Sequence, residues 1–347
     1  MLISLILCLL SAAPPDSVRL FPRPLSEAEI LCIEAEDQRA GCEYSKALET
    51  YRQAAVATSD SLLRSSIDSL VTICRNGIAM SEFCHRPKVA ARQCFGASRF
   101  LEAYPLPEEQ ARRLSESPVD TLMLADSSLI AAFFPLESEG YVYFSSKSLY
   151  GAGGFDLYRC RREPGSPFVE DPENLGFPYS SPADDYLFFN TPDGRFSLFA
   201  SNRGCAPDSI MLYAVLREAV PVRGRVSEGV ALRTLCELAP APEPSASQKP
   251  ALEAYHKAVR EYEELQEALG RHNKELDAMR RRYTVASGAE KQFLGNEISR
   301  METSLPSLRK KCNAAASKVS AAESECRRRG LQPELTVPSW TFSRCQR

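Results

Sequence analysis

The sequence has few of the residues that carry out chemistry in enzymes. Its only histidines are His85, His256 and His272, and Trp340 is its only tryptophan. No two cysteines form a CxxC pair, which argues against zinc knuckles and thioredoxin-type redox sites. The patterns of EF-hand, Walker, zinc-protease, serine-elbow and Rossmann sites are missing too. The sequence therefore predicts no catalytic residue, no metal site and no cofactor.

The chain also lacks an excess of charge and a long apolar run. Its net charge of −3 over 347 residues leaves no electrostatic footprint for nucleic acid. Leu2 to Ala13 are nearly all apolar, but twelve residues cannot span a bilayer as a helix. Residues 1–13 are therefore predicted to be a signal peptide. Because Leu7 precedes Cys8, plain cleavage is favoured over lipidation of Cys8. An uncleaved apolar N-terminus on a cytosolic protein is the alternative.

Cysteine itself is not scarce, since the chain has twelve. Eleven remain once Cys8 is removed with the signal peptide. In an oxidising compartment some of these would pair and at least one thiol would be left over. In the other interpretation, several are small buried apolar residues. The sequence does not select a pairing.

The stretch from Gly140 to Arg203 organises the chain. Short β-rich runs alternate there with turn clusters, as in an antiparallel sheet. The turn Thr191-Pro192-Asp193-Gly194 joins two of these runs, with proline and glycine at positions that need fixed or positive φ. The predicted strands are Thr121–Ala125, Leu129–Phe134, Tyr141–Ser146, Phe155–Arg161, Asp185–Asn190, Phe196–Ser201 and Ile210–Leu216.

Four sub-motifs in this stretch, GGFDLY, ENLG, SPADDYLFF and FASNR, occur in a set order. In that order they resemble the WD-like β-propeller repeats of the TolB type, over roughly residues 120 to 217. The resemblance implies an exported bacterial protein of the cell envelope, of a kind often built with tetratricopeptide helices and sometimes with an OmpA-like domain. No OmpA-like segment is found here, so peptidoglycan binding is not supported. The predicted strands suffice for about two blades in residues 119–224, whereas closed propellers have typically four to eight.

The region before the sheets, residues 26–110, is predicted to be helical and tetratricopeptide-like. Ser26 and Glu29 form a capping box. Beyond the break at Gly41–Tyr44, small residues and tyrosines alternate at helical spacing, as in the second helix of such a repeat. Further helices are predicted at Asp60–Ala79 and Pro87–Tyr104.

The C-terminal third carries the clearest periodicity. A proline-rich linker, 237–249, leads into two apolar stripes of heptad spacing separated by Thr284–Gly288. They predict an antiparallel coiled-coil hairpin over residues 250–330, about 50 Å long at 1.5 Å per residue. The second stripe, here called the second seam, consists of Leu294, Ile298, Met301, Leu305, Leu308, Cys312, Ala315, Val319, Ala322 and Cys326. Folding back at the turn brings Met279 opposite Leu294 and Tyr262 opposite Cys312. A tail, 331–347, completes the chain.

Several residues invite a chemical interpretation that the sequence does not sustain. Cys84 and His85 are adjacent, but neighbours in sequence do not make a nucleophile–base dyad, and no acidic partner is evident. Asp184 and Asp185 point to opposite faces of an extended chain, so turn capping by one of them is preferred over a shared site. The loop Gly151–Gly154 precedes a strand rather than a helix, which argues against phosphate binding. His272 falls on the coiled-coil seam, where a polar residue setting the register is expected.

Taken together, the sequence predicts a multidomain α+β chain made of a helical segment, an antiparallel β-sheet domain of about two blades and a coiled-coil hairpin. The predicted function is a non-enzymatic scaffold for protein interactions, periplasmic or at the inner face of the outer membrane. Its partners would be other envelope proteins, with no nucleic acid and no membrane span after signal removal. Arg280–Arg282 and Arg327–Arg329 belong to solvated helix faces or meet an acidic partner. The alternatives are an envelope enzyme or inhibitor with a site between the helical and β parts, and a cytosolic adaptor.

Overall fold

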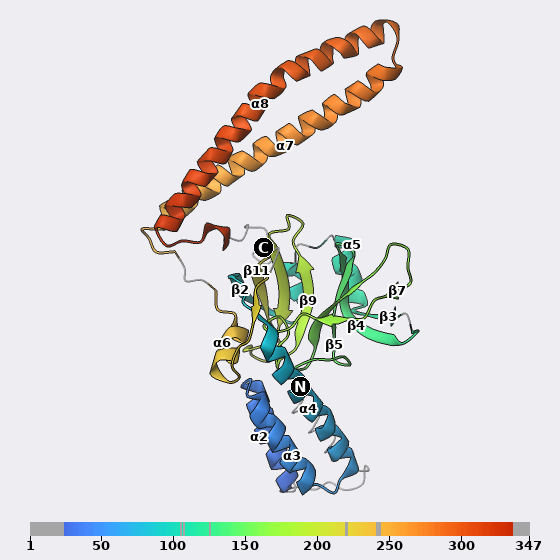
Figure 1. Ribbon diagram of the computed structural model, residues 1–347, viewed down its shortest axis with the longest axis vertical. Coiled ribbons are helices and arrows are strands. Elements are labelled where there is room, and N and C mark those ends of the chain that lie inside the picture. Colours follow the sequence, from blue (N-terminus) through green and yellow to red (C-terminus); the bar gives the residue numbers. More distant parts are fainter. Residues whose placement is uncertain are drawn as a thin grey trace.

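The computed structural model describes residues 24–104, 106, 108–124, 126–218, 221–240 and 244–335 (Figure 1). The predicted signal peptide, with Cys8, and most of the tail, with Trp340, lie outside the described residues. Among the helices of the described residues, none combines the length and the apolar character that crossing a membrane requires.

Three helices open the described chain. They are α2 (Glu27–Ala40), α3 (Tyr44–Ala57) and α4 (Ser61–Met80). The capping box predicted for the first of them is present. The Ser26 hydroxyl accepts from the Glu29 backbone N–H, and the Glu29 carboxylate accepts from the Ser26 backbone N–H. Asp60 caps α4 by accepting from the N–H groups of Leu62 and Leu63. All three pack around one apolar cluster that also reaches the sheet region.

Two antiparallel sheets form the centre of the molecule. One has the strand order β7-β3-β4-β5-β6-β8, with only the β3–β7 pair parallel, and the other has the order β2-β11-β10-β9. The first sheet is built from β3 (Val119–Leu124), β4 (Leu129–Ser138), β5 (Tyr141–Ser146), β6 (Asp156–Arg161), β7 (Phe168–Val169) and β8 (Glu173–Asn174). The second is built from β2 (Val89–Gly96), β9 (Asp185–Asn190), β10 (Phe196–Ser201) and β11 (Ser209–Leu216). A mixed chain of helices and antiparallel sheets, without a closed barrel, is confirmed.

The helix predicted at Pro87–Tyr104 is wrong. That segment forms strand β2, which pairs with β11 from Ser209–Gly96 to Val215–Val89, followed by the short 3₁₀ helix η2 (Phe100–Ala103). Its alanine, arginine and glutamine residues favour a helix. The open edge of β11 supplies a ladder of backbone hydrogen bonds, and this tertiary pairing overrides the local preference.

Short elements join the sheets to the helices. Strand β1 (Cys84–His85) pairs with β12 (Arg223–Gly224), so the start and the end of the sheet region meet. Helix α6 (Val230–Glu237) follows and packs into the cluster of α2, α3 and α4 through Leu232 and Cys236. Helix α5 (Glu108–Glu116) lies in the connector that the sequence marks as charged.

The last two helices, α7 (Lys249–Val285) and α8 (Gly288–Arg328), lie against each other and project from the sheets (Figure 1). Every residue of the second seam is buried or half-buried, and helix α8, which carries it, continues through Pro306. The Cys312 thiol contacts the carbonyl oxygen of Leu265 at 3.4 Å and His272 contacts that of Met301 at 3.0 Å, so the two helices touch at several levels of the hairpin. The 3₁₀ helix η3 (Pro333–Leu335) then contacts α8, β2 and β11.

Candidate functional site

A cleft of about 460 Å³ lies where β5, β6 and the β1–β12 pair face β9, β10 and β11. Four arginines line it, namely Arg86, Arg159, Arg217 and Arg223, against a single carboxylate, that of Glu218. We call it the arginine cleft. The pairing of His85 with Arg223 across β1 and β12 brings the two ends of the sheet region together at this cleft.

Neighbouring carboxylates compensate only part of this positive charge. Arg159 donates to the Glu173 carboxylate from two nitrogens, at 3.0 and 2.8 Å, and Arg223 lies 3.6 Å from the same carboxylate. Arg217 forms a two-pronged pair with Glu139. Arg86 is exposed and makes no ion pair with another described residue. Two carboxylates outside the cleft therefore serve three arginines, which leaves the cleft attractive to an anion.

His85 lies in the wall of the arginine cleft and is largely buried. It is 7% exposed, its backbone N–H donates to the Phe177 carbonyl at 2.7 Å, and its Nδ1 is buried and has no partner among the described residues. Burial, with the positive charge of Arg223 and Arg159, lowers the pKa of His85 to about 4. The ring is therefore neutral at pH 7 and adds no cation to the cleft.

Aromatic rings form the apolar part of the arginine cleft. Tyr143 stacks on Phe188 with ring centroids 4.9 Å apart, and Tyr179 meets both Phe188 and His85 edge-on. Guanidinium groups beside aromatic faces suit a ligand that combines a carboxylate with an apolar or planar portion. The lining offers guanidinium, hydroxyl, amide and aromatic groups that can bind a ligand.

The paired aspartates do not lie in the cleft, and the structure separates their side chains as expected. Asp184 accepts from the Phe155 N–H at 2.9 Å and from Asn202 at 3.1 Å, which are the contacts of a turn-capping residue. Asp185 is fully buried, where it pairs with Arg203 and accepts from Ser181 at 2.8 Å. Arg203 also donates to backbone carbonyl oxygens of the surrounding loops. Asp185 and Arg203 therefore hold the sheet region together.

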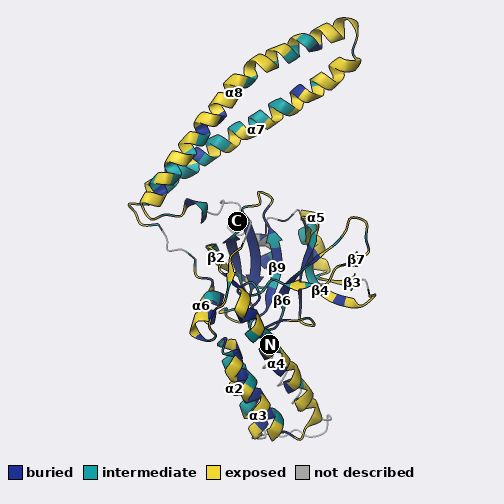
Figure 2. Ribbon diagram, viewed as in Figure 1, coloured by how far each residue is buried: buried dark blue, intermediate teal, exposed yellow. Residues whose placement is uncertain are grey.

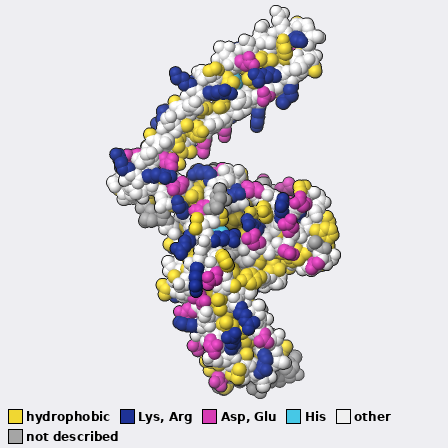
Figure 3. Space-filling model, in the orientation of Figure 1, with side chains coloured by type: hydrophobic (Ala, Val, Ile, Leu, Met, Phe, Trp, Pro, Cys, Tyr) yellow, Lys and Arg dark blue, Asp and Glu magenta, His cyan; other side chains and the backbone are white. Residues whose placement is uncertain are grey.

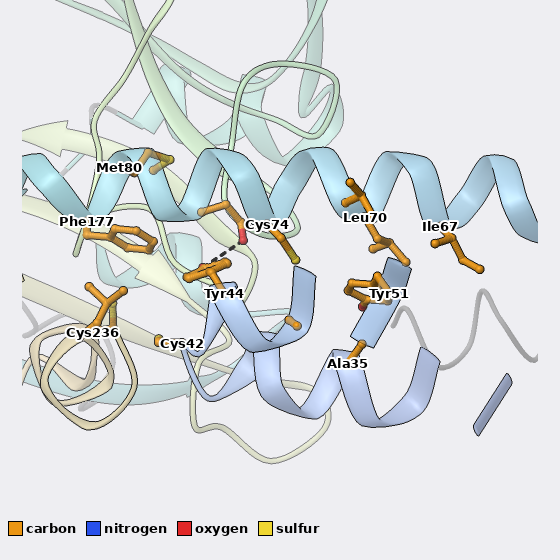
Figure 4. Close-up of a cluster of buried hydrophobic side chains, with 14 of the residues drawn as sticks. Ala35, Cys42, Tyr44, Tyr51, Ile67, Leu70, Cys74, Met80, Phe177 and Cys236 are labelled. Atoms are coloured by element: carbon orange, nitrogen blue, oxygen red, sulfur yellow. Dashed lines mark hydrogen bonds between the residues drawn. The ribbon is translucent and has the colours of Figure 1, made fainter. Parts of the chain in front are cut away.

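The glycine loop Gly151–Gly154 is the contact between the sheets and the N-terminal helices. The carbonyl oxygen of Ala152 accepts from the Tyr44 hydroxyl at 3.1 Å and from Arg39 at 3.3 Å (Figure 4). A Cβ at Gly153 would lie 2.1 Å from the carbonyl oxygen of Ser181, so only glycine fits. The loop binds protein groups on both sides, in agreement with the argument against a phosphate site.

The remaining candidates take structural places. Cys84 and His85 are consecutive on β1, but burial raises the pKa of the Cys84 thiol to about 11, so the thiolate is not populated at neutral pH. On the hairpin, His272 contacts the carbonyl oxygen of Met301 at 3.0 Å across the seam. No group of three or more histidine, cysteine or acidic side chains able to hold a metal ion is found in the described part of the chain.

The arginine cleft was not predicted from the sequence. Arg86, Arg217 and Arg223 lie at or just beyond the ends of β1, β11 and β12, and Arg159 lies within β6. These positions are far apart along the chain, so no local spacing in the sequence predicts that they meet. No family model, no curated protein and no solved structure matches this chain.

Proposed function

We propose that this protein is a non-enzymatic scaffold of the bacterial cell envelope that holds an acidic segment of another protein in the arginine cleft. The observation that carries the proposal is the lining of the cleft, with four arginines and one carboxylate. An extended acidic peptide would place carboxylates against the arginines and its apolar portions against the rings of Tyr143 and Tyr179.

The envelope setting rests on the resemblance of the four sub-motifs to TolB-type repeats. The strand order supports it, because β3 to β6 form one meander of four strands and β2 completes a second set of four with β9, β10 and β11. Two sets of four strands are the strand content of two blades. In the same proposal α2 and α3 are one tetratricopeptide-like unit, and export follows from a signal peptide at residues 1–13.

The hairpin α7–α8 is the proposed second recognition element, a coiled-coil arm. Residues 249–329 contain 17 Lys and Arg against 12 Asp and Glu, whereas the whole chain has a net charge of −3. Figure 3 shows charged side chains of both signs spread over the visible face of the hairpin. An arm of this charge favours an acidic partner surface, and its contribution to binding will fall as salt rises.

The test of the cleft is direct binding of a labelled hexaglutamate peptide to the purified protein, with hexalysine as the comparison. We expect hexaglutamate to bind to the unmodified protein. The double variant R86A/R223A should bind it at least tenfold more weakly, because two of the four arginines of the cleft are removed. The matched control is R161A, an exposed arginine on β6 that does not line the cleft. Equal binding of both peptides, or equal loss in R161A, would overturn the proposal.

The envelope setting is tested separately, by fractionation of cells that express the full chain with a C-terminal tag. A periplasmic protein shortened at its N-terminus is the expected result. A full-length protein in the cytosol would favour the adaptor alternative and would leave the binding result of the cleft unaffected.

A further inference from the structure

Cys42 and Cys236 are 194 positions apart in the sequence but neighbours in the fold. Cys42 lies in the turn between α2 and α3, and Cys236 lies in the last turn of α6. Both side chains belong to one buried apolar cluster and lie at the same end of it in Figure 4, and each thiol is the leading influence on the pKa of the other. Both are free thiols in this structure.

The backbone around this first pair is held in place by contacts of its own. The Gly229 N–H donates to the Cys42 carbonyl oxygen at 2.8 Å, and Ser45 donates to Glu228 at 2.7 and 2.8 Å. Arg203 donates to the Cys236 carbonyl oxygen at 2.9 Å. These hydrogen bonds hold the backbone around Cys42 and Cys236 in place without a disulfide bond between the two residues.

A second pair repeats the arrangement on the sheet. Cys94 lies on β2 opposite Met211 of β11, and Cys205 lies in the loop that joins β10 to β11. The Cys205 Sγ lies 3.8 Å from the carbonyl oxygen of Ser201, the β10 residue that pairs with Met211, so Cys205 and Cys94 meet at one level of the sheet. Cys94 is exposed and Cys205 half-exposed, so a dissolved oxidant reaches this pair directly.

We propose that Cys42 with Cys236 and Cys94 with Cys205 form two disulfide bonds in an oxidising compartment. In each case two S–H bonds break and one S–S bond forms, releasing two protons and two electrons. A small-molecule disulfide such as oxidised glutathione accepts the electrons and is reduced to two thiols. The bonds would tie the α2–α3 turn to α6 and the edge strand β2 to the β10–β11 loop.

The electrostatics at the first pair favour attack by Cys42. Its hydrogen bond with Cys236, together with the positive charge of Arg203, lowers the pKa of the Cys42 thiol, while the pKa of Cys236 is raised. The thiolate is the nucleophile in thiol–disulfide exchange, so Cys42 forms the mixed disulfide and Cys236 resolves it. Cys42 also acts electrostatically on Cys84 of the same cluster, but burial raises the pKa of the Cys84 thiol to about 11 and that of Cys74 to about 12, so neither is a thiolate at neutral pH.

The experiment is oxidation of the purified full chain with oxidised glutathione, followed by alkylation of the remaining thiols and peptide mapping by mass spectrometry. We expect the linked peptides 42–236 and 94–205, and alkylated Cys74 and Cys160. The oxidised protein should melt on the order of 5 °C higher than the reduced protein, since cross-links across long loops constrain the unfolded chain. That difference should shrink in C42A and persist in C74A, which is equally buried.

Other linkages, or four alkylated cysteines at a glutathione ratio that oxidises ordinary structural pairs, would overturn the proposal. Because the map is read on the unmodified protein, it remains decisive even if C42A does not fold. The inference does not depend on the ligand of the arginine cleft. If both linkages form but hexaglutamate does not bind, only the proposed function is contradicted.

Discussion

The sheet region with α2, α3 and α4 and the hairpin of α7 and α8 are stabilised in different ways. In the first, large aromatic side chains such as Tyr44, Tyr51 and Phe199 are fully buried. In the hairpin, most residues are exposed or half-buried, as Figure 2 shows. The buried ones are chiefly small, namely Ala251, Ala258, Cys312, Ala315 and Cys326 beside Leu276 and Leu294. A hairpin of two helices has no third layer, so each helix buries only one narrow stripe.

The same contrast holds for charge. Arg203 and Asp185 form an ion pair with side-chain exposures of 9% and 0%, inside the sheet region. The pair of Lys318 and Glu261 across the hairpin has exposures of 59% and 45%. Buried pairs are costly to break because the remaining charge is stranded, whereas exposed pairs are screened by water and salt. The loss of stability on breaking a buried or an exposed ion pair is therefore the largest measurable difference between the two regions.

Replacing Arg203 by alanine should therefore be severely destabilising. The change strands the Asp185 carboxylate and removes the donor to the carbonyl oxygens of Pro178, Tyr179 and Cys236. We expect the free energy of unfolding to fall by about 3–5 kcal/mol. Urea denaturation followed by tyrosine fluorescence measures it.

The matched control is K318A in the hairpin, which removes an exposed cation from its pair with Glu261. Its expected loss is below about 1 kcal/mol, and it should vanish in high salt. Similar losses in R203A and K318A would contradict the contrast between buried and exposed pairs.

The second prediction uses pH and compares His85 of the sheet region with His256 of the hairpin. The pKa of buried His85 is lowered to about 4, so the folded protein resists protonation where the unfolded chain, with a pKa of about 6.5, accepts a proton. Stability is thus fully present above pH 6.5 and falls as the pH drops toward 4. A shift of this size corresponds to at most about 3 kcal/mol.

The variant H85Q has no imidazole to protonate, so its stability should depend less on pH between 6.5 and 4. Urea denaturation at several pH values gives the difference from the unmodified protein. H256Q is the comparison, since His256 lies half-exposed on α7 and its pKa is lowered too. A pH dependence unchanged in H85Q would show that His85 is accessible to protons in the folded protein.

The elements with local signals were predictable from the sequence. The strands at Tyr141–Ser146, Asp185–Asn190 and Phe196–Ser201 were predicted to the residue, since each is a β-rich run closed by turn residues. The break between α7 and α8 was predicted from Thr284–Gly288. Turn chemistry and periodicity act over a few residues and are therefore visible in a single sequence.

What depends on distant partners was not predictable. The strand β2 has a helical composition and becomes a strand only because β11 offers an edge. The arginine cleft depends on residues 86, 159, 217 and 223, which meet only once both sheets have formed. In the hairpin, heptad spacing sets which face is buried but not the level at which the two helices meet.

The third prediction reverses the usual effect of a glycine in a helix. Replacing a helical glycine by alanine normally stabilises by about 0.5–1 kcal/mol, and G270A in α7 should do so because nothing lies within 4 Å of the added Cβ. In α4 the Cβ of G77A would lie 2.4 Å from ring carbons of Tyr44, which is fully buried and cannot move aside. We expect G77A to lower the free energy of unfolding by about 1–3 kcal/mol through overpacking.

Urea denaturation of G77A and G270A measures the sign of each effect. The double variant G77A/Y44F separates the ring contact from the hydrogen bond of Tyr44, since phenylalanine keeps the ring and should not relieve the loss. If G77A stabilises as G270A does, then α4 is not pressed against Tyr44, and the close packing that distinguishes these helices from the hairpin is absent.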